Sequence, residues 1–218
     1  MIPTLDEAEA LRRSLPAALA WADEVVVSDG GSGDGTPELA RRLGAVVVEG
    51  SPGRGPQMNR GAALATSDVL LFLHADTRLP PEAAEEIRRA IVSGAAGGAF
   101  RVRFDSSRWA FRLGSWWVNQ RSRWFSVPLG DQAQFATRDA FDALGGFEEW
   151  PILEDLDFAR RLRRHGRMTL LAGPATTSIR RFESLGAART ITRNYLIWGL
   201  FLLGVSPHRL AWLYRRTH

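Results

Sequence analysis

Short apolar, β-branched runs alternate with stretches of helical periodicity along the first half of the chain. Runs at residues 25–28, 45–48 and 69–73 have the composition of buried strands. Helical patterns follow them at 36–43, 57–65 and 81–92, and the first of these opens with a Thr-Pro pair suited to a helix start. This alternation predicts an α/β fold with a mostly parallel, Rossmann-like sheet flanked by helices.

The second half of the chain mixes both kinds of element. Alternating apolar and basic positions at 99–104 predict a half-exposed strand, and an aromatic-rich helix is expected at 108–124. Further strands are expected at 132–137, 168–171 and 176–180, a helix at 154–164, and a C-terminal helical extension at 187–203 and 208–216. The longest apolar run, residues 195–205, is too short for a spanning helix, which needs roughly 20 residues.

Composition narrows the possible chemistry. The 218 residues suit one large α/β domain, and the absence of Cys excludes disulfides, Cys-zinc sites and a thiol nucleophile. All 28 basic residues are Arg, which excludes a Schiff-base lysine and a P-loop lysine. The N-terminus has no signal-peptide pattern, so we expect a cytoplasmic protein, with peripheral attachment to the inner face of the membrane as a further expectation.

Charge is distributed unevenly along the chain. Residues 1–157 contain 16 Arg and 23 acidic residues, a balance of −7, whereas residues 158–218 contain 12 Arg and one acidic residue, a balance of +11. The pI near 10.7 alone would suggest nucleic acid, but an acidic front and a basic tail suggest two separate tasks. We therefore do not expect a nucleic-acid partner.

A glycine-rich turn follows the first predicted buried strand. The strand ends at Asp29, and residues 30–36 lead into a helix. Ligands bind at the carboxyl ends of strands in open α/β sheets, and an Asp there can accept hydrogen bonds from a base or ribose. The alternative interpretation is a plain Gly/Asp turn.

Acidic residues follow two other apolar segments. His74 and Asp76 end the strand at 69–73, where a carboxylate could share a hard cation with a substrate diphosphate; the alternative is a hydrogen-bonded pair at the strand end. Glu154 and Asp155 begin a helix. They could supply a carboxylate base that faces a cleft; the alternative is that acids are found there because the helix dipole stabilises them. A third segment, the loop 53–55, presents Arg54 before a helix, either to phosphate or to solvent.

In this order and spacing, these segments resemble the family 2 inverting glycosyltransferases with the GT-A fold. The resemblance rests on residues 2–8, 29–36, 53–55 with Asn59, 74–76, 141–147 and 154–157 with 160–161. Residues 73–80, 130–132 and 178–181 are further similar to a small bacterial subgroup associated with radical SAM/selenoprotein neighbourhoods.

The resemblance implies roles for individual residues. Pro3, Leu5 and Glu7 would line the nucleoside site of a UDP- or GDP-linked sugar, Asp29 would bind the base or ribose, and Arg54 would lie near the base or diphosphate. Asp76 would hold Mg²⁺ or Mn²⁺ on the diphosphate, with His74 as a second candidate ligand. Asp155 would be the base that deprotonates the acceptor.

The sequence departs from the family pattern in three places. His74 replaces the first Asp of the family's D-x-D motif, and Asp6 replaces the usual Asn. The chain also begins at Met1-Ile2-Pro3, where the family usually has several strand residues first, which predicts a short first strand with unpaired ladder groups beside it. We expect either a start further upstream or another way of completing that edge.

Aromatic and basic residues suggest an acceptor side. Trp116, Trp117 and Trp124, together with Glu154, are candidates for contact with the acceptor, although a core helix would also explain the tryptophans. The apolar segment 195–203 is flanked by arginines, which suggests a membrane surface or a lipid-phosphate acceptor; the alternative is burial against the sheet or a homodimer partner. Arg180 and Arg181 could instead clamp the diphosphate.

These observations predict a metal-dependent inverting glycosyltransferase. Residues 1–180 would form the catalytic domain, with a nucleotide-sugar half at about 1–100 and an acceptor half at about 101–180, and residues 181–218 would form the basic tail. The alternatives are a nucleotidyltransferase of similar layout and a non-catalytic basic module that binds membrane or nucleic acid. The acidic Leu5-Asp6-Glu7 segment disfavours the nucleotidyltransferase, which usually has a basic first loop.

Overall fold

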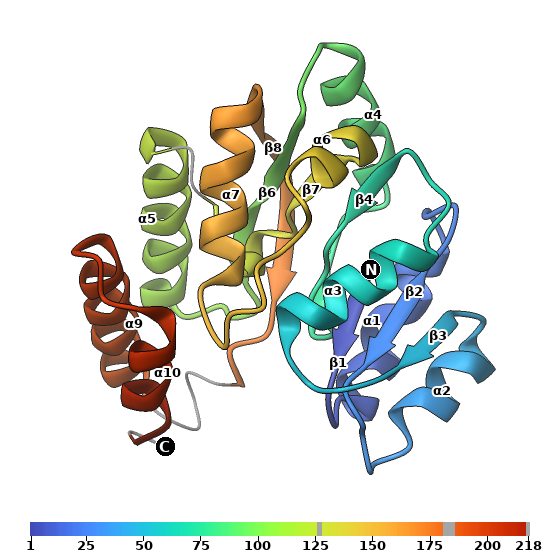
Figure 1. The fold of residues 1–218 in the computed structure, drawn as a ribbon, viewed down its shortest axis with the longest axis horizontal. Coiled ribbons are helices and arrows are strands. Elements are labelled where there is room, and N and C mark those ends of the chain that lie inside the picture. Colours follow the sequence, from blue (N-terminus) through green and yellow to red (C-terminus); the bar gives the residue numbers. More distant parts are fainter. Residues whose placement is uncertain (126–127, 181–185, 217–218) are drawn as a thin grey trace.

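A computed structural model describes residues 1–125, 128–180 and 186–216 (Figure 1). Its N-terminal half contains a parallel three-stranded sheet of β1 (Ile2–Thr4), β2 (Val26–Asp29) and β3 (Val46–Glu49) in sequence order. The connecting helices are α1 (Ala8–Leu19) and α2 (Thr36–Leu43), and α3 (Arg54–Leu64) follows β3. The expected strand–helix alternation is confirmed here.

A second, mixed sheet occupies the middle of the molecule, in the order β4-β7-β6-β8-β5. The long strands β6 (Gly97–Phe104) and β8 (Met168–Thr177) run parallel. β4 (Val69–Leu71), β5 (Thr77–Arg78) and β7 (Phe135–Thr137) pair antiparallel with their neighbours. The α/β class with a parallel sheet flanked by helices is confirmed, and the antiparallel pairs belong to the second half.

Met1 joins the two sheets. Its amino nitrogen donates to the Leu71 carbonyl at 2.9 Å, and its carbonyl accepts from the Leu73 amide at 2.9 Å. Bonds to the residues on either side of Phe72 form the pattern of a parallel ladder, so β1 lies next to β4. The edge expected to remain unpaired is therefore completed by Met1.

Helices cover both faces of the sheets and form two apolar cores. On one face, α1 and α4 (Ala83–Val92) pack against the strands through a cluster that includes Ile2, Leu11, Leu15, Val27, Ile87, Phe100 and Phe135. On the other, α3, α6 (Arg138–Ala143) and α7 (Glu154–His165) enclose a cluster that includes Leu70, Phe72, Phe141, Phe147 and Phe158. The second core supports the loops that precede α7.

Most predicted elements are present within a few residues. The predicted helix at 36–43 matches α2, whereas α3 begins at Arg54, three residues before the predicted start. The two short strands expected at 168–171 and 176–180 are one continuous strand, β8. Helices α1 and α6 were not predicted.

The C-terminal extension consists of α9 (Ala187–Leu202) and α10 (Pro207–Arg216), which lie beside α5 (Trp109–Phe125) on the left of Figure 1. Ile197, Leu210 and Ala211 are buried. The Trp117 indole donates to the Tyr195 hydroxyl at 2.8 Å and thereby ties α9 to α5. Over the part of the chain that the structure describes, no helix is both long and apolar enough to cross a membrane.

Candidate active site

Asp29 organises the glycine-rich loop after β2. Its fully buried carboxylate accepts from the Thr4 and Ser32 hydroxyls and from the Gly31 and Ser32 amides, at 2.6–2.8 Å. Burial acts to raise the pKa of Asp29, but these hydrogen bonds outweigh it and hold the pKa below its usual value. The Asp29 carboxylate already accepts four hydrogen bonds from the protein. A base or ribose that contacts Asp29, as predicted, would have to share this carboxylate with those donors.

The loop after β1 docks on the loop after β2. Asp6, at φ 53°, accepts from the Gly33 amide at 2.8 Å, while Asp34 accepts from the Ala8 amide at 2.9 Å. These reciprocal bonds fix the segment that contains Leu5 and Glu7. Leu5 is 48% exposed beside this loop, and its contact with a nucleoside stays a prediction.

Glu7 also connects this edge to the end of β8. Its carboxylate forms an ion pair with the Arg180 guanidinium at 2.9 Å, and both side chains are partly exposed. Asp76 is near enough to add to the elevation of the pKa of Arg180, although the bond to Glu7 is the main cause. Arg180 therefore lies near both Glu7 and Asp76. Arg181 lies outside the described residues.

The predicted base and His74, one of the two predicted metal ligands, meet around Gly130, in the 3₁₀ turn Gly130–Gln132. The Gly130 amide donates to the Asp155 carboxylate at 2.6 Å. A Cβ built on Gly130 would lie 2.8 Å from His74 Nε2 and 2.9 Å from Asp155 Oδ2, so the turn fits closely between them. The structure therefore brings the end of β4 and the start of α7 to one place.

Asp131 is a third acid at this place and was not among the predicted site residues. Burial raises its pKa to about 6; Arg121 opposes the shift, and Asp155 and Asp76 add to it. Its Oδ1 is buried and has no hydrogen-bond partner among the described residues. The Gly-Asp-Gln sequence singled out by the resemblance was the signal that could have identified it.

Glu154 lies beneath Asp155 and pairs with Arg54. The Arg54 Nε lies 2.8 Å from Glu154 Oε1, and the Glu154 side chain is 2% exposed. Burial raises the pKa of Glu154, and the buried carboxylate in turn raises the pKa of Arg54. Arg54 therefore lies at the start of α7, and the predicted contact of Glu154 with an acceptor would require an acceptor to reach a buried carboxylate that is already paired with Arg54.

Close packing holds α3 and α7 at this distance. A Cβ on Gly55 would lie 2.4 Å from the Glu148 carbonyl, so only glycine allows α3 to approach the loop before α7. The Asn59 side chain exchanges two hydrogen bonds of 2.8 Å with the Phe147 backbone. Arg54 and Glu154 are thus positioned by the second core.

The carboxylates suit a cation that the substrate would help to coordinate. Within the described ranges, no three His, Asp or Glu side chains form a metal site by themselves. Asp76 and the unpartnered oxygen of Asp131 are nevertheless hard donors, which Mg²⁺ or Mn²⁺ prefers, and such ions use few carboxylates when phosphates supply the remaining ligands. The donor set therefore fits a cation shared with a diphosphate.

The candidate acceptor tryptophans lie elsewhere. Trp116, Trp117 and Trp124 are 53%, 45% and 60% exposed on α5, so the alternative that they form a core is wrong. Trp117 and Trp124 pack edge to face and continue toward α9. They therefore lie on an exposed surface of α5 and not at the centre around Gly130.

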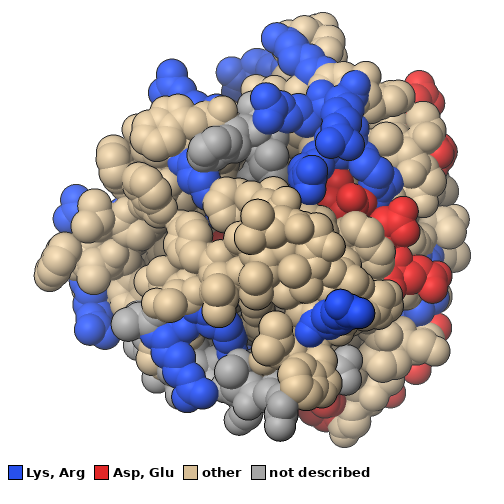
Figure 2. Space-filling view, turned by 60° about the vertical axis from the view of Figure 1, so that its left-hand side comes forward, with Lys and Arg blue, Asp and Glu red and all other residues tan. Residues whose placement is uncertain are grey.

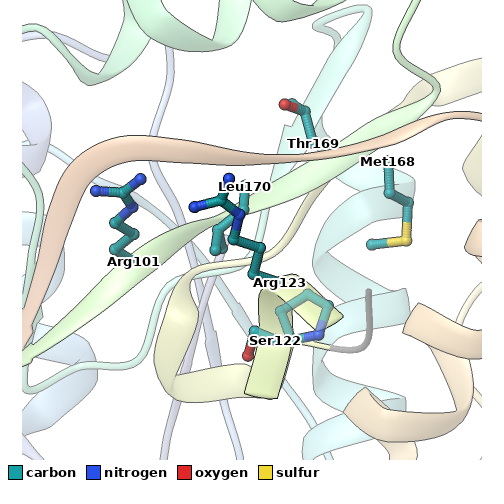
Figure 3. A pocket seen from close by; sticks show the side chains of 7 residues that line it. Arg101, Ser122, Arg123, Met168, Thr169 and Leu170 are labelled. Atoms are coloured by element: carbon teal, nitrogen blue, oxygen red, sulfur yellow. The ribbon is translucent and has the colours of Figure 1, made fainter. Parts of the chain in front are cut away.

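A cavity of about 370 Å³ lies between α5, β6 and β8 (Figure 3). Arg101, Ser122 and Arg123 line it together with residues from the start of β8. None of the predicted site residues borders this cavity.

The architecture corresponds to that of the GT-A glycosyltransferases. A mannosyltransferase from Pyrobaculum calidifontis, solved with GDP-Man and Mn²⁺, superposes with a TM-score of 0.65 and 21% identity, over 82% of this chain and 55% of that one. TarS of S. aureus, residues 1–349 in complex with UDP-GlcNAc, gives 0.60 and 16% over 81% and 57%. This chain thus spans little more than half of each solved chain.

The sequence profile of glycosyl transferase family 2 matches residues 1–147, and the chain belongs to this family. A TPR repeat-containing protein of Synechococcus elongatus is 39% identical over 85 residues, which cover 38% of this chain and 21% of that protein. The predicted family is confirmed.

Proposed function

We propose that this protein transfers a sugar from a nucleoside-diphosphate donor to an acceptor hydroxyl or phosphate, with a divalent cation and with inversion at the anomeric carbon. The observation that supports it best is the convergence of His74, Asp76, Asp131 and Asp155 around Gly130. These groups come from three separate segments of the chain. Local turn or helix-capping preferences therefore do not explain why they lie together.

The donor would lie along the carboxyl ends of β1, β2 and β4. Pro3, Leu5 and Glu7 would contact the nucleoside, with Asp29 holding the loop beneath it. Arg180 could leave Glu7 and pair with the diphosphate, because a guanidinium matches phosphate oxygens in the same bidentate way. The neighbours solved with GDP-Man and UDP-GlcNAc support a nucleotide-sugar donor without deciding the base.

Asp76 would hold the cation, with His74 or Asp131 as a further ligand. The bound cation would neutralise charge on the departing nucleoside diphosphate. The Mn²⁺ of the mannosyltransferase complex supports a divalent ion here. A cation would also compensate for the mutual repulsion of Asp76, Asp131 and Asp155.

Asp155 would remove the proton of the acceptor hydroxyl as the hydroxyl attacks. Its carboxylate is oriented by the amides of Gly130 and Leu156, at 2.6 and 2.7 Å. Attack on the side opposite the leaving group is a single displacement, which inverts the anomeric carbon. Glu154 and Arg54 would keep the start of α7 in place behind Asp155.

The remaining assignments follow from this arrangement. Residues 1–180 would be the catalytic domain and 181–218 a tail that belongs to the acceptor side. Membership of the small subgroup associated with radical SAM/selenoprotein neighbourhoods is part of the proposal, as is hexose as the transferred sugar.

The donor part is tested by calorimetric titration of UDP and GDP with Mn²⁺ and with EDTA, on the native chain and on Asp76→Asn. We expect one nucleotide to bind at least tenfold more tightly with Mn²⁺, and Asp76→Asn to remove most of that difference. Exposed Asp105→Asn is the matched control and should behave as the native chain does. Equal affinity with Mn²⁺ and EDTA would contradict metal-assisted donor binding.

A further inference from the structure

Three neighbouring helices expose an unusual number of large apolar side chains. Six of the eight tryptophans are on α5, α9 and α10. Side chains at least 43% exposed come from all three helices and from the residue after α9: Trp109, Leu113, Trp116, Trp117, Trp124, Ile191, Leu196, Leu202, Leu203, Trp212 and Leu213. We call these residues the apolar face. Exposure on this scale usually marks a surface that is covered in use.

The charged residues of the three helices have one sign. None of the three helices contains an acidic residue. Exposed arginines accompany the apolar side chains: Arg108, Arg112, Arg123, Arg189 and Arg209. Figure 2, turned so that this side comes forward, shows a broad uncharged surface with arginines above and below it and acidic residues along its right-hand margin.

The apolar face adjoins the active site. Phe201 of α9 packs edge-on against Trp150, in the loop before α7, with ring centroids 5.8 Å apart. Arg160 of α7 lies over the same Phe201 ring at 5.6 Å. Tyr214 of α10 is close enough to Arg54 to contribute to its raised pKa, after the larger effect of Glu154. The three helices therefore border the centre that contains Asp155.

A second copy of the chain is a poor match for this surface. In a twofold dimer the same patch meets itself, which would bring two sets of arginines together with no acidic residue on these helices to pair with them. A nucleic acid would satisfy the arginines but would leave the apolar side chains in water. An anionic bilayer satisfies both, because its headgroups attract arginine and its acyl region accepts Trp and Leu.

We propose that the apolar face docks this protein on a bilayer that contains anionic lipid. The helices lie in the interface and do not cross it, in keeping with the lack of a spanning helix in the described part of the chain. Docking places the centre around Gly130 close to the lipid surface. The docking does not depend on the proposed sugar transfer, so it is tested by binding alone.

The experiment is flotation of the full chain with vesicles of phosphatidylcholine, alone or with about one third phosphatidylglycerol. We expect the chain to float with the anionic vesicles and remain at the bottom with the neutral ones. Quenching of tryptophan fluorescence by brominated acyl chains should accompany flotation, because six tryptophans lie on these helices.

Two variants and two matched controls separate the apolar from the charged contribution. The double variant Leu203→Ser and Trp212→Ser should weaken partitioning more than about tenfold. Arg209→Gln should weaken it about fivefold, the equivalent of about 1 kcal/mol per basic residue at an anionic surface. Val92→Ser, which is 83% exposed as Leu203 is, and exposed Arg42→Gln lie outside the face and should change nothing.

Two results would overturn the proposal. One is the absence of flotation, or equal flotation of all four variants. The other is a dimer, seen by light scattering, that Leu203→Ser and Trp212→Ser dissociate while the native chain ignores vesicles. In that case the apolar face is an interface between copies.

Discussion

At the scale of single residues, the site is defined by carboxylates that the fold forces together. Asp131 shows this best, since burial and the neighbouring Asp155 and Asp76 all oppose its ionisation while Arg121 favours it. A protein tolerates such a group where a function requires it. His74, Asp76 and Asp155 could be predicted because each follows an apolar segment at an element boundary. Asp131 was missed: its neighbours Arg121, Asp155 and Asp76 are separate in sequence, and only the Gly-Asp-Gln sequence pointed to it.

The raised pKa of Asp131 makes stability depend on pH. In the folded chain the pKa is about 6, above the usual 3.8, so the folded state binds the proton more tightly than the unfolded state. The stabilising contribution of Asp131 to the free energy of unfolding is therefore fully present below about pH 4. It is lost as the pH rises to about 6. Asp131→Asn should raise the free energy of unfolding by about 3 kcal/mol at pH 7.5 and by little at pH 4.

Thermal unfolding at the two pH values measures this difference. Asp142→Asn, at an exposed position on α6, is the control and should give the same small change at both. A stabilisation by Asp131→Asn that is the same at pH 4 and pH 7.5 would contradict the account.

At the scale of elements, the sequence predicts strands and helices well where periodicity is clear. The sequence predicts less well where a helix or strand begins or ends if that boundary depends on packing. Helix α3 starts early because Gly53-Arg54-Gly55 is drawn against the loop before α7, and β8 continues as one strand because β6 pairs along its length. Helix α1 contains Pro16, which weakens the sequence pattern although the helix forms.

Asn59 carries the contact between α3 and the loop before α7. Asn59→Ala removes both bonds to Phe147 and leaves an amide and a carbonyl unpaired. We expect a loss of about 2 kcal/mol in the free energy of unfolding, measured by urea denaturation. Asn194→Ala, at an exposed position in helix α9, gains the same helix propensity and should not destabilise. Equal effects of the two substitutions would refute the role of Asn59.

At the scale of the whole molecule, the division by charge differs from the division by fold. The acidic front, residues 1–157, supplies β1 to β7 and Asp76, Asp131 and Asp155, whereas the basic end supplies β8 as well as α9 and α10. The sequence predicted the α/β class and the family. It could not predict that the tryptophans of α5 remain exposed, because a helix rich in aromatic residues is equally typical of a core.

The central claim is that Asp155 is the base of a sugar transfer. The most direct measurement is the release of nucleoside diphosphate from UDP- and GDP-linked sugars by the native chain and by Asp155→Asn, with donor affinity measured in parallel. Asn keeps the shape of the side chain and an oxygen that can accept from Gly130. The control is Asp139→Asn, since Asp139 also lies in the first turn of a helix, α6, but is exposed.

The account predicts that Asp155→Asn lowers turnover about 10²–10⁴-fold with donor affinity unchanged, and that Asp139→Asn retains full turnover. Turnover by Asp155→Asn equal to that of the native chain would contradict it, and Asp155 would then be only an acid that suits the start of α7.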